Sequence, residues 1–467
     1  MKRIGIFICN YNKCEYVLNC VNSLLEQTCK DMDVYVVDNA STDDSVAKLK
    51  DRFHDQIEII VHKENLGGSG GFCTGIRTGL SKNYEYIMLI DNDVIVEQNT
   101  VQTMLNYMET HKDVGILGPL ILQMADRERI QDFGGSIAKN YTMKGNYYNE
   151  LVSEAKFPAE MECEYISTCT AMARVEAIKN FGLMPEDNFI YYDDVEWSKK
   201  CQIAGYKTVA ISTCKVWHNL TGSDRYSTFV QYYYVRNSLH YFSKYLEEEK
   251  INEYVDYMLS EIFAKMFGFK YKGMIENFEN IFYAFDDFLH NVRGKADSYK
   301  IMQTQKRNTP FENIIMDKNK IKILFMDNPL YEDALGNYYM LNYIISVICN
   351  KNMQNKVYIS LKDCNCDKEE FETNLKHILG NIHSNSKMPE ICIDESGQEF
   401  DVVLKMCEHV KMVEEYIPAY VYVDKYCNCI ASEADYKYFS SASEIEKFFV
   451  DMYKPLMMKT VKELRNT

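Results

Sequence analysis

The first 120 residues alternate short apolar runs with longer helical patterns, and this rhythm restricts the fold more than any other feature. The apolar runs are short and rich in β-branched residues, as buried strands are, and they cover residues 4–9, 34–37, 57–61, 87–90 and 114–117. The helical patterns between them cover residues 14–26, 43–51, 71–81 and 100–110. This alternation predicts an α/β layer fold with a parallel sheet.

Polar residues follow each of the first four apolar runs. In open α/β sheets, ligands bind beyond the carboxyl ends of the strands. The residues at these ends are Asn10-Tyr11-Asn12, Asp38-Asn39-Ala40-Ser41, Glu64-Asn65-Leu66-Gly67-Gly68 and Asp91-Asn92-Asp93. We therefore expect acidic and amide side chains to converge on one rim of the sheet.

Asp91 and Asp93 end an apolar strand and are separated by one residue. Their carboxylate oxygens are hard ligands that suit a divalent cation, which can in turn hold a diphosphate. The alternative is that these acids cap a helix or solvate a turn. His218 follows Val216-Trp217 at the end of another apolar run. It is either a third ligand or a histidine with ordinary hydrogen bonds.

The segment Asn65-Leu-Gly-Gly-Ser-Gly-Gly-Phe72 has four glycines in five positions before a helical pattern. It is either a flexible turn or a helix N-terminus whose amides approach phosphate oxygens. No Lys-Ser/Thr follows the glycines, so the segment is not a P-loop. A dinucleotide-binding spacing from Gly68 and Gly70 would need glycine at position 73, which is cysteine. A nicotinamide-dependent enzyme is therefore disfavoured.

A second acidic group, Asp193-Asp194-Val195-Glu196-Trp197, lies at the start of a helical pattern. One of its acids is expected to cap the helix, because a negative charge complements the helix dipole there. With Tyr191 and Tyr192 directly before it, this group places three acids and two tyrosines within six residues, which exceeds what capping requires. A carboxylate of this group that lies near an acceptor hydroxyl can serve as a general base.

The composition favours a globular cytoplasmic protein. The net charge of −16 and the pI near 5.2 argue against a nucleic-acid-binding protein. No apolar run approaches the roughly 20 residues of a membrane span, and no signal-peptide core follows Lys2 and Arg3. The 16 cysteines are then expected to be reduced thiols. Structural zinc stays open as an alternative for two pairs with unusual spacing, Cys364-x-Cys366 and Cys427-x-Cys429.

Changes of pattern along the 467 residues predict several domains. We expect a catalytic domain at residues 1–225 with a mobile loop at 140–158, a helical extension packed on it at 226–295, a polar linker at 296–320, and a smaller α/β domain at 321–467. The last domain carries none of the phosphate or metal residues. We therefore expect it to handle an acceptor, a partner or self-association.

These motifs together resemble an inverting family 2 glycosyltransferase with the GT-A fold. The resemblance covers about residues 1–245 and rests on Asn10-Tyr-Asn12, Val37-Asp-Asn-Ala-Ser41, residues 65–72 and Asp91-Asn-Asp93. Residues 193–197, the Trp217-His218 pair and Tyr233-Tyr-Val-Arg-Asn237 are similar to the branch of bacterial galactofuranosyltransferases and rhamnosyltransferases. The chain departs from the processive synthases of the family, which carry a Gln-x-x-Arg-Trp helix and membrane spans.

The resemblance implies a role for each candidate residue. Asp91, Asp93 and His218 would hold Mn²⁺ or Mg²⁺, and Asp194 would be the catalytic base. A UDP-galactofuranose or dTDP-rhamnose donor would be bound by Asn10, Asp38 (at the uracil or thymine nucleoside), Asn65, Gly67, Gly68, Gly70 and Asn92. An oligosaccharide or lipid-linked acceptor would lie near Asp193, Glu196 and Trp197. A single displacement would then build a bacterial surface polysaccharide or glycolipid.

Several alternatives stay open. The same fold can use a UDP-hexopyranose, or it can bind a nucleotide sugar without transfer, although such a degenerate module would have lost its base or metal residues. A sugar-1-phosphate nucleotidyltransferase would want an Arg- or Lys-bearing glycine-rich loop after the first strand, where this chain has Asn10-Tyr11-Asn12. Peripheral association with the inner face of a membrane and formation of homo-oligomers also stay open.

Overall fold

The computed structural model describes residues 2–219, 226–304, 308–326, 335–351, 356–362, 367–379, 390–393, 399–407 and 409–466. The chain divides into two compact units. Unit 1 consists of residues 1–225, 233–245 and 291–297, and unit 2 consists of residues 226–232, 246–290 and 298–467. The division falls within helix α7 (Thr228–Tyr245). All the candidate site residues lie in unit 1.

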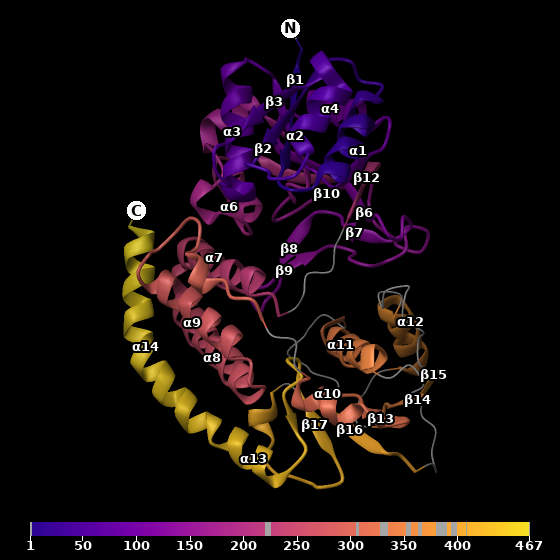
Figure 1. The fold of residues 1–467 in the computed structure, drawn as a ribbon, viewed down its shortest axis with the longest axis vertical. Helices are drawn as coiled ribbons and strands as arrows, with labels where there is room; N and C mark the ends of the chain where they lie inside the picture. The colour runs from indigo at the N-terminus through magenta and orange to yellow at the C-terminus, as the bar shows by residue number, and fades with distance from the viewer. Residues whose placement is uncertain are drawn as a thin grey trace. The chain divides into compact units, whose positions relative to one another are not determined.

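The main sheet of unit 1 is parallel through its first four strands, as the sequence predicts (Figure 1). β1 (Ile4–Asn10) lies between β2 (Met32–Asp38) and β4 (Tyr86–Asp91), and β3 (Glu58–Val61) pairs with β2. The sheet becomes mixed where β11 (Thr170–Arg174) pairs antiparallel with both β4 and β6 (Val114–Gln123). The predicted α/β fold with parallel strands is confirmed, and the later strand β11 adds antiparallel pairing to the sheet.

The far side of this sheet is closed by β12 (Lys207–His218), which runs parallel to β6. β12 is one continuous strand, and its pairing with β6 shifts register between Ile211 and Lys215. It also pairs antiparallel with β5 (Val94–Val96) and β10 (Glu160–Glu162). The expected loop at 140–158 contains β9 (Met143–Gly145), which pairs with β8 (Gly135–Ile137).

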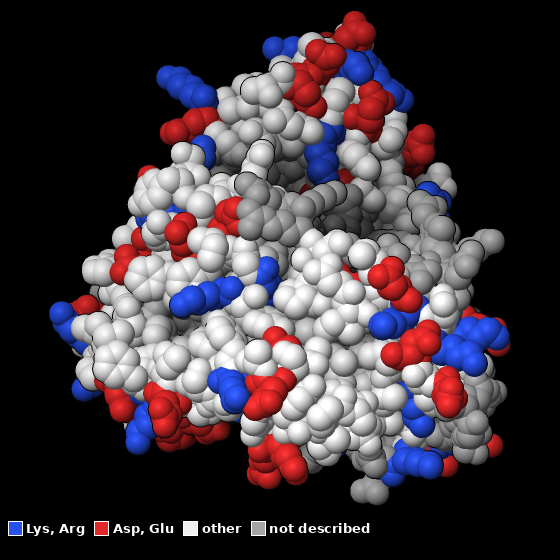
Figure 2. Space-filling model, turned by 60° about the horizontal axis from the view of Figure 1, so that its bottom comes forward, with Lys and Arg blue, Asp and Glu red and all other residues white. Residues whose placement is uncertain are grey.

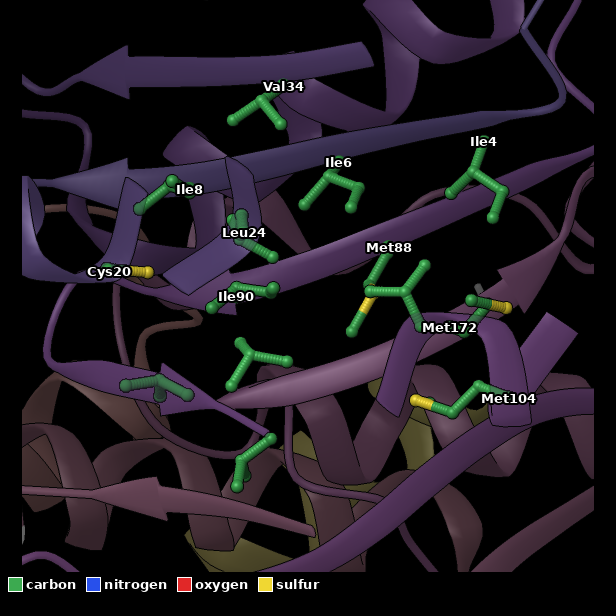
Figure 3. Close-up of a cluster of buried hydrophobic side chains, with 14 of the residues drawn as sticks. Ile4, Ile6, Ile8, Cys20, Leu24, Val34, Met88, Ile90, Met104 and Met172 are labelled. Atoms are coloured by element: carbon green, nitrogen blue, oxygen red, sulfur yellow. The ribbon is translucent and has the colours of Figure 1, made fainter. Parts of the chain in front are cut away.

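Helices cover both faces of the sheet, because successive side chains of a strand point to opposite faces. Ile4, Ile6 and Ile8 of β1 are fully buried in one cluster (Figure 3). This cluster includes residues of α1 (Cys14–Leu25), α2 (Ser45–Phe53) and α4 (Thr100–Thr110). Phe7 points to the second cluster, which includes residues of α3 (Gly67–Ser81), α5 (Val175–Phe181) and α6 (Asp193–Ile203). The two clusters form the core that supports the rim.

Unit 2 contains a second α/β sheet and a group of long helices. Its strands are β13 (Lys320–Leu324), β14 (Lys356–Ser360), β15 (Glu390–Ile393), β16 (Val402–Met406) and β17 (Val421–Val423), all parallel, with β18 (Cys429–Ile430) antiparallel at the edge. Its helices are α8 (Ile251–Tyr271), α9 (Ile275–Leu289), α10 (Pro310–Ile315), α11 (Leu335–Lys351), α12 (Lys368–Leu379), α13 (Glu433–Ser440) and α14 (Ala442–Arg465).

The division of the chain differs from the expected boundaries in two respects. Helices α8 and α9 group with residues 298–467 rather than with the catalytic residues. Within the expected linker, α10 starts at a capping box formed by Thr309 and Glu312 and buries Phe311 and Ile315 in the core of the second sheet. A helix of six residues is too short to give a periodic signal in the sequence.

No helix in the described ranges is both long and apolar enough to cross a membrane. On the face drawn in Figure 2, acidic and basic side chains of the described residues are interspersed. All cysteines of the described residues are free thiols. Cys364 and Cys366 lie outside the described residues, so the zinc alternative is not addressed for that pair.

Candidate active site

Three buried polar side chains at the carboxyl ends of β1, β2 and β4 are bonded to one another. Asn10 Nδ2 donates to Asp38 Oδ1 over 3.0 Å, and Asn92 Nδ2 donates to Asn10 Oδ1 over 2.8 Å. The second Asp38 oxygen accepts from the backbone N–H of Ser41 at 2.9 Å. Because Asn10 and Asp38 are fully buried, they support the rim from below. Direct contact of Asp38 with a nucleoside therefore requires neighbouring groups to move.

The structure brings Asp91, Asp93 and His218 together. One ligand atom from each of the three lies within 4.8 Å of the others, and no second such group occurs among the described residues. His218 Nε2 lies 3.2 Å from Asp93 Oδ1 and 4.0 Å from Asp91 Oδ2. β4 delivers Asp91, the turn after it delivers Asp93, and pairing of His218 with Val94 brings the end of β12 to the same place. Two carboxylates and one imidazole are a suitable ligand set for a divalent cation.

The two carboxylates of this cluster have pKa values shifted in opposite directions by their surroundings. Burial, followed by the neighbouring carboxylates, raises the pKa of Asp91 to about 7 despite the opposing effect of His218. Against the effect of burial, the neighbouring His218 ring and Lys13 ammonium lower the pKa of Asp93. Lys13 Nζ lies 3.0 Å from Asp93 Oδ2 and leaves the other oxygen facing His218. Each ligand thus keeps an atom that can face a shared cation.

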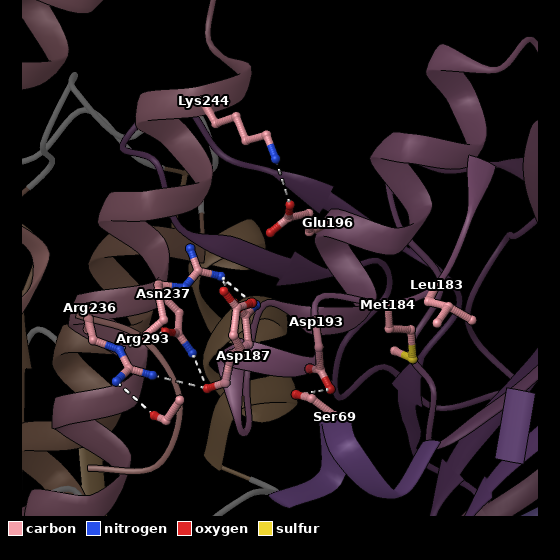
Figure 4. A network of polar contacts seen from close by, with 12 residues as sticks. Ser69, Leu183, Met184, Asp187, Asp193, Glu196, Arg236, Asn237, Lys244 and Arg293 are labelled. Atoms are coloured by element: carbon pink, nitrogen blue, oxygen red, sulfur yellow. Dashed lines mark hydrogen bonds and ion pairs between the residues drawn. The ribbon is translucent and has the colours of Figure 1, made fainter. Parts of the chain in front are cut away.

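The loop before α6 is held in an unusual conformation. Phe189, Tyr191 and Tyr192 have φ values of 67°, 65° and 62°, in the left-handed region that non-glycine residues rarely adopt. Asn237 of α7 stabilises this loop by donating from Nδ2 to the carbonyl oxygens of Asn188, Ile190 and Tyr191, at 3.0, 2.8 and 3.1 Å (Figure 4). The loop in turn places the first residues of α6.

Asp193 and Asp194 begin α6 in different surroundings. Asp193 is 8% exposed, and its Oδ2 accepts from Ser69 Oγ over 2.9 Å. Asp194 is more exposed, and its Oδ1 accepts from the N–H of Val195 at 2.8 Å. Burial, followed by the charge of Asp193, raises the pKa of Asp194 to about 8. Of the two carboxylates, Asp194 has the surroundings of a proton acceptor.

The glycine-rich segment packs closely against the protein. Gly67 has φ +76°, and a Cβ there would lie 2.0 Å from the carbonyl oxygen of Phe189. The Gly67 amide donates to Asn65 Oδ1 at 2.8 Å, and the Ser69 amide donates to the Phe189 oxygen at 3.2 Å. A Cβ at Gly70 would clash with Leu66, whereas one at Gly68 would meet nothing within 4 Å. Of the three glycines proposed for the donor, Gly68 alone is not buried.

Two of the expected acceptor-binding residues, Trp197 and Glu196, are buried in the interior of unit 1. Trp197 is 1% exposed, donates from Nε1 to the carbonyl oxygen of Gly182 at 3.0 Å, and stacks edge-on against Phe181. Glu196 is 5% exposed and accepts from Lys244 and Tyr245 at 3.4 and 3.0 Å. The assignment of Trp197 to the acceptor is corrected to a core role, because helix periodicity turns this position toward the sheet.

Sequence reasoning missed four residues that surround the candidate site. Ser69 and Asn237 position α6, Lys13 neutralises Asp93, and Gln131 contacts His218. Ser69 and Asn237 stand inside noted motifs, but nothing in the sequence marks their partners.

A further carboxylate, Asp132, is 9% exposed, and burial raises its pKa to about 7.

Residues 5–159 match the sequence model described as Glycosyl transferase family 2. The match includes Asp91 and Asp93 but ends before Asp194 and His218.

Similar proteins include other glycosyltransferases. The chain is 22% identical over 200 residues to an uncharacterized glycosyltransferase of Haemophilus influenzae, which covers 42% of this chain and 59% of that relative. It is 27% identical over 200 residues to the dTDP-rhamnosyl transferase RfbF of Shigella flexneri, with 42% and 62% covered. This chain thus spans about three fifths of these relatives. A solved structure of TarS from S. aureus is similar with a TM-score of 0.42, at 18% identity, over 62% of this chain and 49% of that one.

Proposed function

We propose that the protein is an inverting glycosyltransferase that moves a sugar from a nucleoside diphosphate to a hydroxyl of an acceptor. The observation that carries this proposal is the meeting of Asp91, Asp93 and His218 on the rim of a family 2 fold. A partly exposed carboxylate, Asp194, begins the helix that Ser69 of α3 helps to hold. A leaving-group site and a proton acceptor are the two parts that single displacement needs.

In this mechanism, Asp91, Asp93 and His218 would hold a divalent cation, Mn²⁺ or Mg²⁺, which when bound would supply positive charge to the departing diphosphate. Asp194 accepts the proton of the acceptor hydroxyl. The acceptor oxygen forms its bond to the anomeric carbon on the face opposite the breaking carbon–oxygen bond. The electron pair of that bond leaves with the nucleoside diphosphate, so one displacement inverts the anomeric centre.

The donor-binding residues of this proposal surround the buried rim. Asn10, Asp38 and Asn92 shape it, and Gly68 is the open position of the glycine-rich segment. Asn65 acts through the turn into α3, since its side chain is bonded to the Gly67 amide. Asp193 and Glu196 are proposed to shape the acceptor side through the position of α6.

We propose dTDP-rhamnose or UDP-galactofuranose as the donor. The motifs of residues 65–72 and 193–197 support this branch, and one relative is named as a dTDP-rhamnosyl transferase. Release of nucleoside diphosphate from a panel of activated sugars tests both the activity and the donor. Release from UDP-glucose alone would refute the branch and leave transfer intact, whereas no release from any donor in the presence of Mn²⁺ and acceptor sugars would refute the function.

We propose that residues 321–467 bind the acceptor or a partner, and that the protein works in the cytoplasm, at the inner membrane face where the acceptor is lipid-linked. Sedimentation of the whole protein with vesicles that carry a lipid-linked sugar tests the membrane role. Equal sedimentation with plain vesicles would argue against recognition of the acceptor.

A further inference from the structure

A glutamine on a neighbouring strand contacts the imidazole of the proposed cation cluster. Gln131 lies in β7 (Ile130–Asp132), and its amide Nε2 is 2.7 Å from His218 Nδ1. The opposite ring nitrogen, Nε2, is the one that faces Asp93 and Asp91. Gln131 is therefore bonded to the side of the ring that points away from the carboxylates.

The position of the ring proton decides whether His218 can bind a cation. A neutral imidazole carries one proton, and the nitrogen without it is the ligand. For His218 Nε2 to face a cation, the proton must lie on Nδ1. The group beside Nδ1 must then accept a hydrogen bond, which an amide oxygen does and an amide nitrogen does not.

The Gln131 amide can supply that acceptor. Its Oε1 is buried and has no hydrogen-bond partner, so no bond to this oxygen keeps it away from the ring. The two ends of an amide have nearly the same shape, and a half-turn about the last side-chain bond exchanges oxygen and nitrogen. After that half-turn, Oε1 accepts from His218 Nδ1–H and the lone pair of Nε2 points at the carboxylates.

The backbone around Gln131 is well supported on both sides. β7 pairs with β6, and β6 pairs with β12 so that Gln123 is the partner of His218. On its other side, the carbonyl oxygen and the amide of Ile130 bond to the amide of Asn149 and the carbonyl oxygen of Glu150, at 2.7 and 2.9 Å. A side chain on such a strand can hold a neighbouring ring in one orientation.

We propose that Gln131 is a positioning residue of the cation site: through its amide oxygen it holds the His218 proton on Nδ1 and leaves Nε2 as the ligand. The proposal rests on the proposed function only in that a cation binds at this cluster. Gln131 would then decide which ring nitrogen of His218 is free to bind the cation, and so how strongly the cation binds. Gln131 itself lies outside the aspartate and histidine motifs.

The test compares two substitutions at this position with a matched control. Gln131→Met has a similar length and makes no hydrogen bond, whereas Gln131→Glu restores an acceptor. The control, Gln123→Met, makes the same change of side chain in β6, the strand that pairs with both β7 and β12. Gln123 Nε2 is bonded to Asn149 Oδ1 at 3.3 Å rather than to His218. Mn²⁺ affinity is measured by electron paramagnetic resonance without nucleotide, and the ring proton is located by ¹H–¹⁵N spectra with saturating Mg²⁺.

We expect Gln131→Met to weaken Mn²⁺ binding about 10- to 100-fold, while Gln131→Glu and Gln123→Met stay close to the unchanged protein. The spectra of the unchanged protein are expected to show the proton on Nδ1 of His218, identified by the signals lost in His218→Gln. Unchanged Mn²⁺ affinity in Gln131→Met, or a proton on Nε2, would overturn the positioning role alone. Absence of Mn²⁺ binding in the unchanged protein would overturn the cation site as well.

Discussion

The hydroxyl of Ser69 donates to Asp193 Oδ2 over 2.9 Å and so links the first turn of α3 to the first turn of α6 (Figure 4). This bond distinguishes two carboxylates that are neighbours in the sequence. Asp193 is held by the protein, whereas Asp194 is the more exposed of the two. The two acids should therefore respond differently to the same substitution.

Asp194→Asn should reduce turnover by about 10²- to 10⁴-fold, because the amide keeps the shape of the side chain but accepts no proton. Donor binding should change little. Asp193→Asn should have a smaller effect, since an amide oxygen can still accept from Ser69, and Ser69→Ala reports what loss of that bond costs. A larger loss of turnover in Asp193→Asn than in Asp194→Asn would assign the role of base to Asp193 instead. Steady-state kinetics with both substrates varied distinguishes these outcomes.

The pH dependence of catalysis should follow Asp194. Its pKa of about 8 means that the base is increasingly protonated below that pH, so kcat/KM for the acceptor should rise with pH through the neutral range. In Asp193→Asn the neighbouring charge is gone, and the midpoint of the rise should move to lower pH. An unchanged midpoint in that variant would show that another group controls the profile.

The same raised pKa predicts an effect on stability. A carboxyl group whose pKa is higher in the folded than in the unfolded protein stabilises the fold only while it is protonated, so this contribution decreases as the pH rises from about 4 to about 8. Asp194→Asn removes the charge, and it should raise the melting temperature more at pH 8.5 than at pH 5. An equal change at both pH values would contradict the raised pKa.

Turnover should require a divalent cation. Excess chelator should abolish activity, and Mn²⁺ or Mg²⁺ should restore it. Asp93→Asn removes one of the two carboxylates of the cluster and should weaken binding of nucleoside diphosphate in the presence of Mn²⁺, as measured by calorimetry. Full activity in excess chelator would contradict the assignment of Asp91, Asp93 and His218 as ligands of a divalent cation.

Asn237→Ala should disturb the loop before α6. It leaves the carbonyl oxygens of Asn188, Ile190 and Tyr191 without their shared donor, which should lower the free energy of unfolding by about 1–3 kcal/mol. Activity should fall further than stability, because the loop places Asp194. Asn180→Ala is the matched control, since Asn180 makes one exposed bond to Tyr206. Denaturant unfolding and turnover are measured for both variants. A loss of turnover in Asn237→Ala but not in Asn180→Ala would show that the effect comes from the loop before α6.

The first four strands and the position of Asp91 and Asp93 at the end of β4 are predictable because their signals are local. A β-branched run that ends in Asp-x-Asp needs no tertiary information to be recognised. β11 is different: it lies between β4 and β6 although about 80 residues separate it from β4, and nothing in its sequence specifies an antiparallel partner. The same holds for Gln131 and His218, which meet only because both strands flank β6.

The acidic group at residues 193–197 and the glycine-rich segment show where local reasoning fails within the site. The sequence marks Trp197 by its acidic neighbours, yet the periodicity of α6 turns the indole into the core beside Phe181. It also marks Gly67 as a phosphate contact, whereas the space beside that residue is filled by the carbonyl of Phe189. Burial and backbone contacts depend on which elements pack together, and a motif does not contain that information.

Because His218 lies far along the chain from Asp91 and Asp93, the three residues come together only when the sheet is complete. Asp91 and Asp93 lie at and just after the end of β4, which pairs with β1, whereas the pairing of β12 with β6 and β5 brings His218 to them. A cation that binds all three ligands therefore binds the closed sheet and not a chain in which β12 is still free. By mass action, such a cation would favour the complete sheet over a chain in which β12 is released, by an amount that increases with the cation concentration.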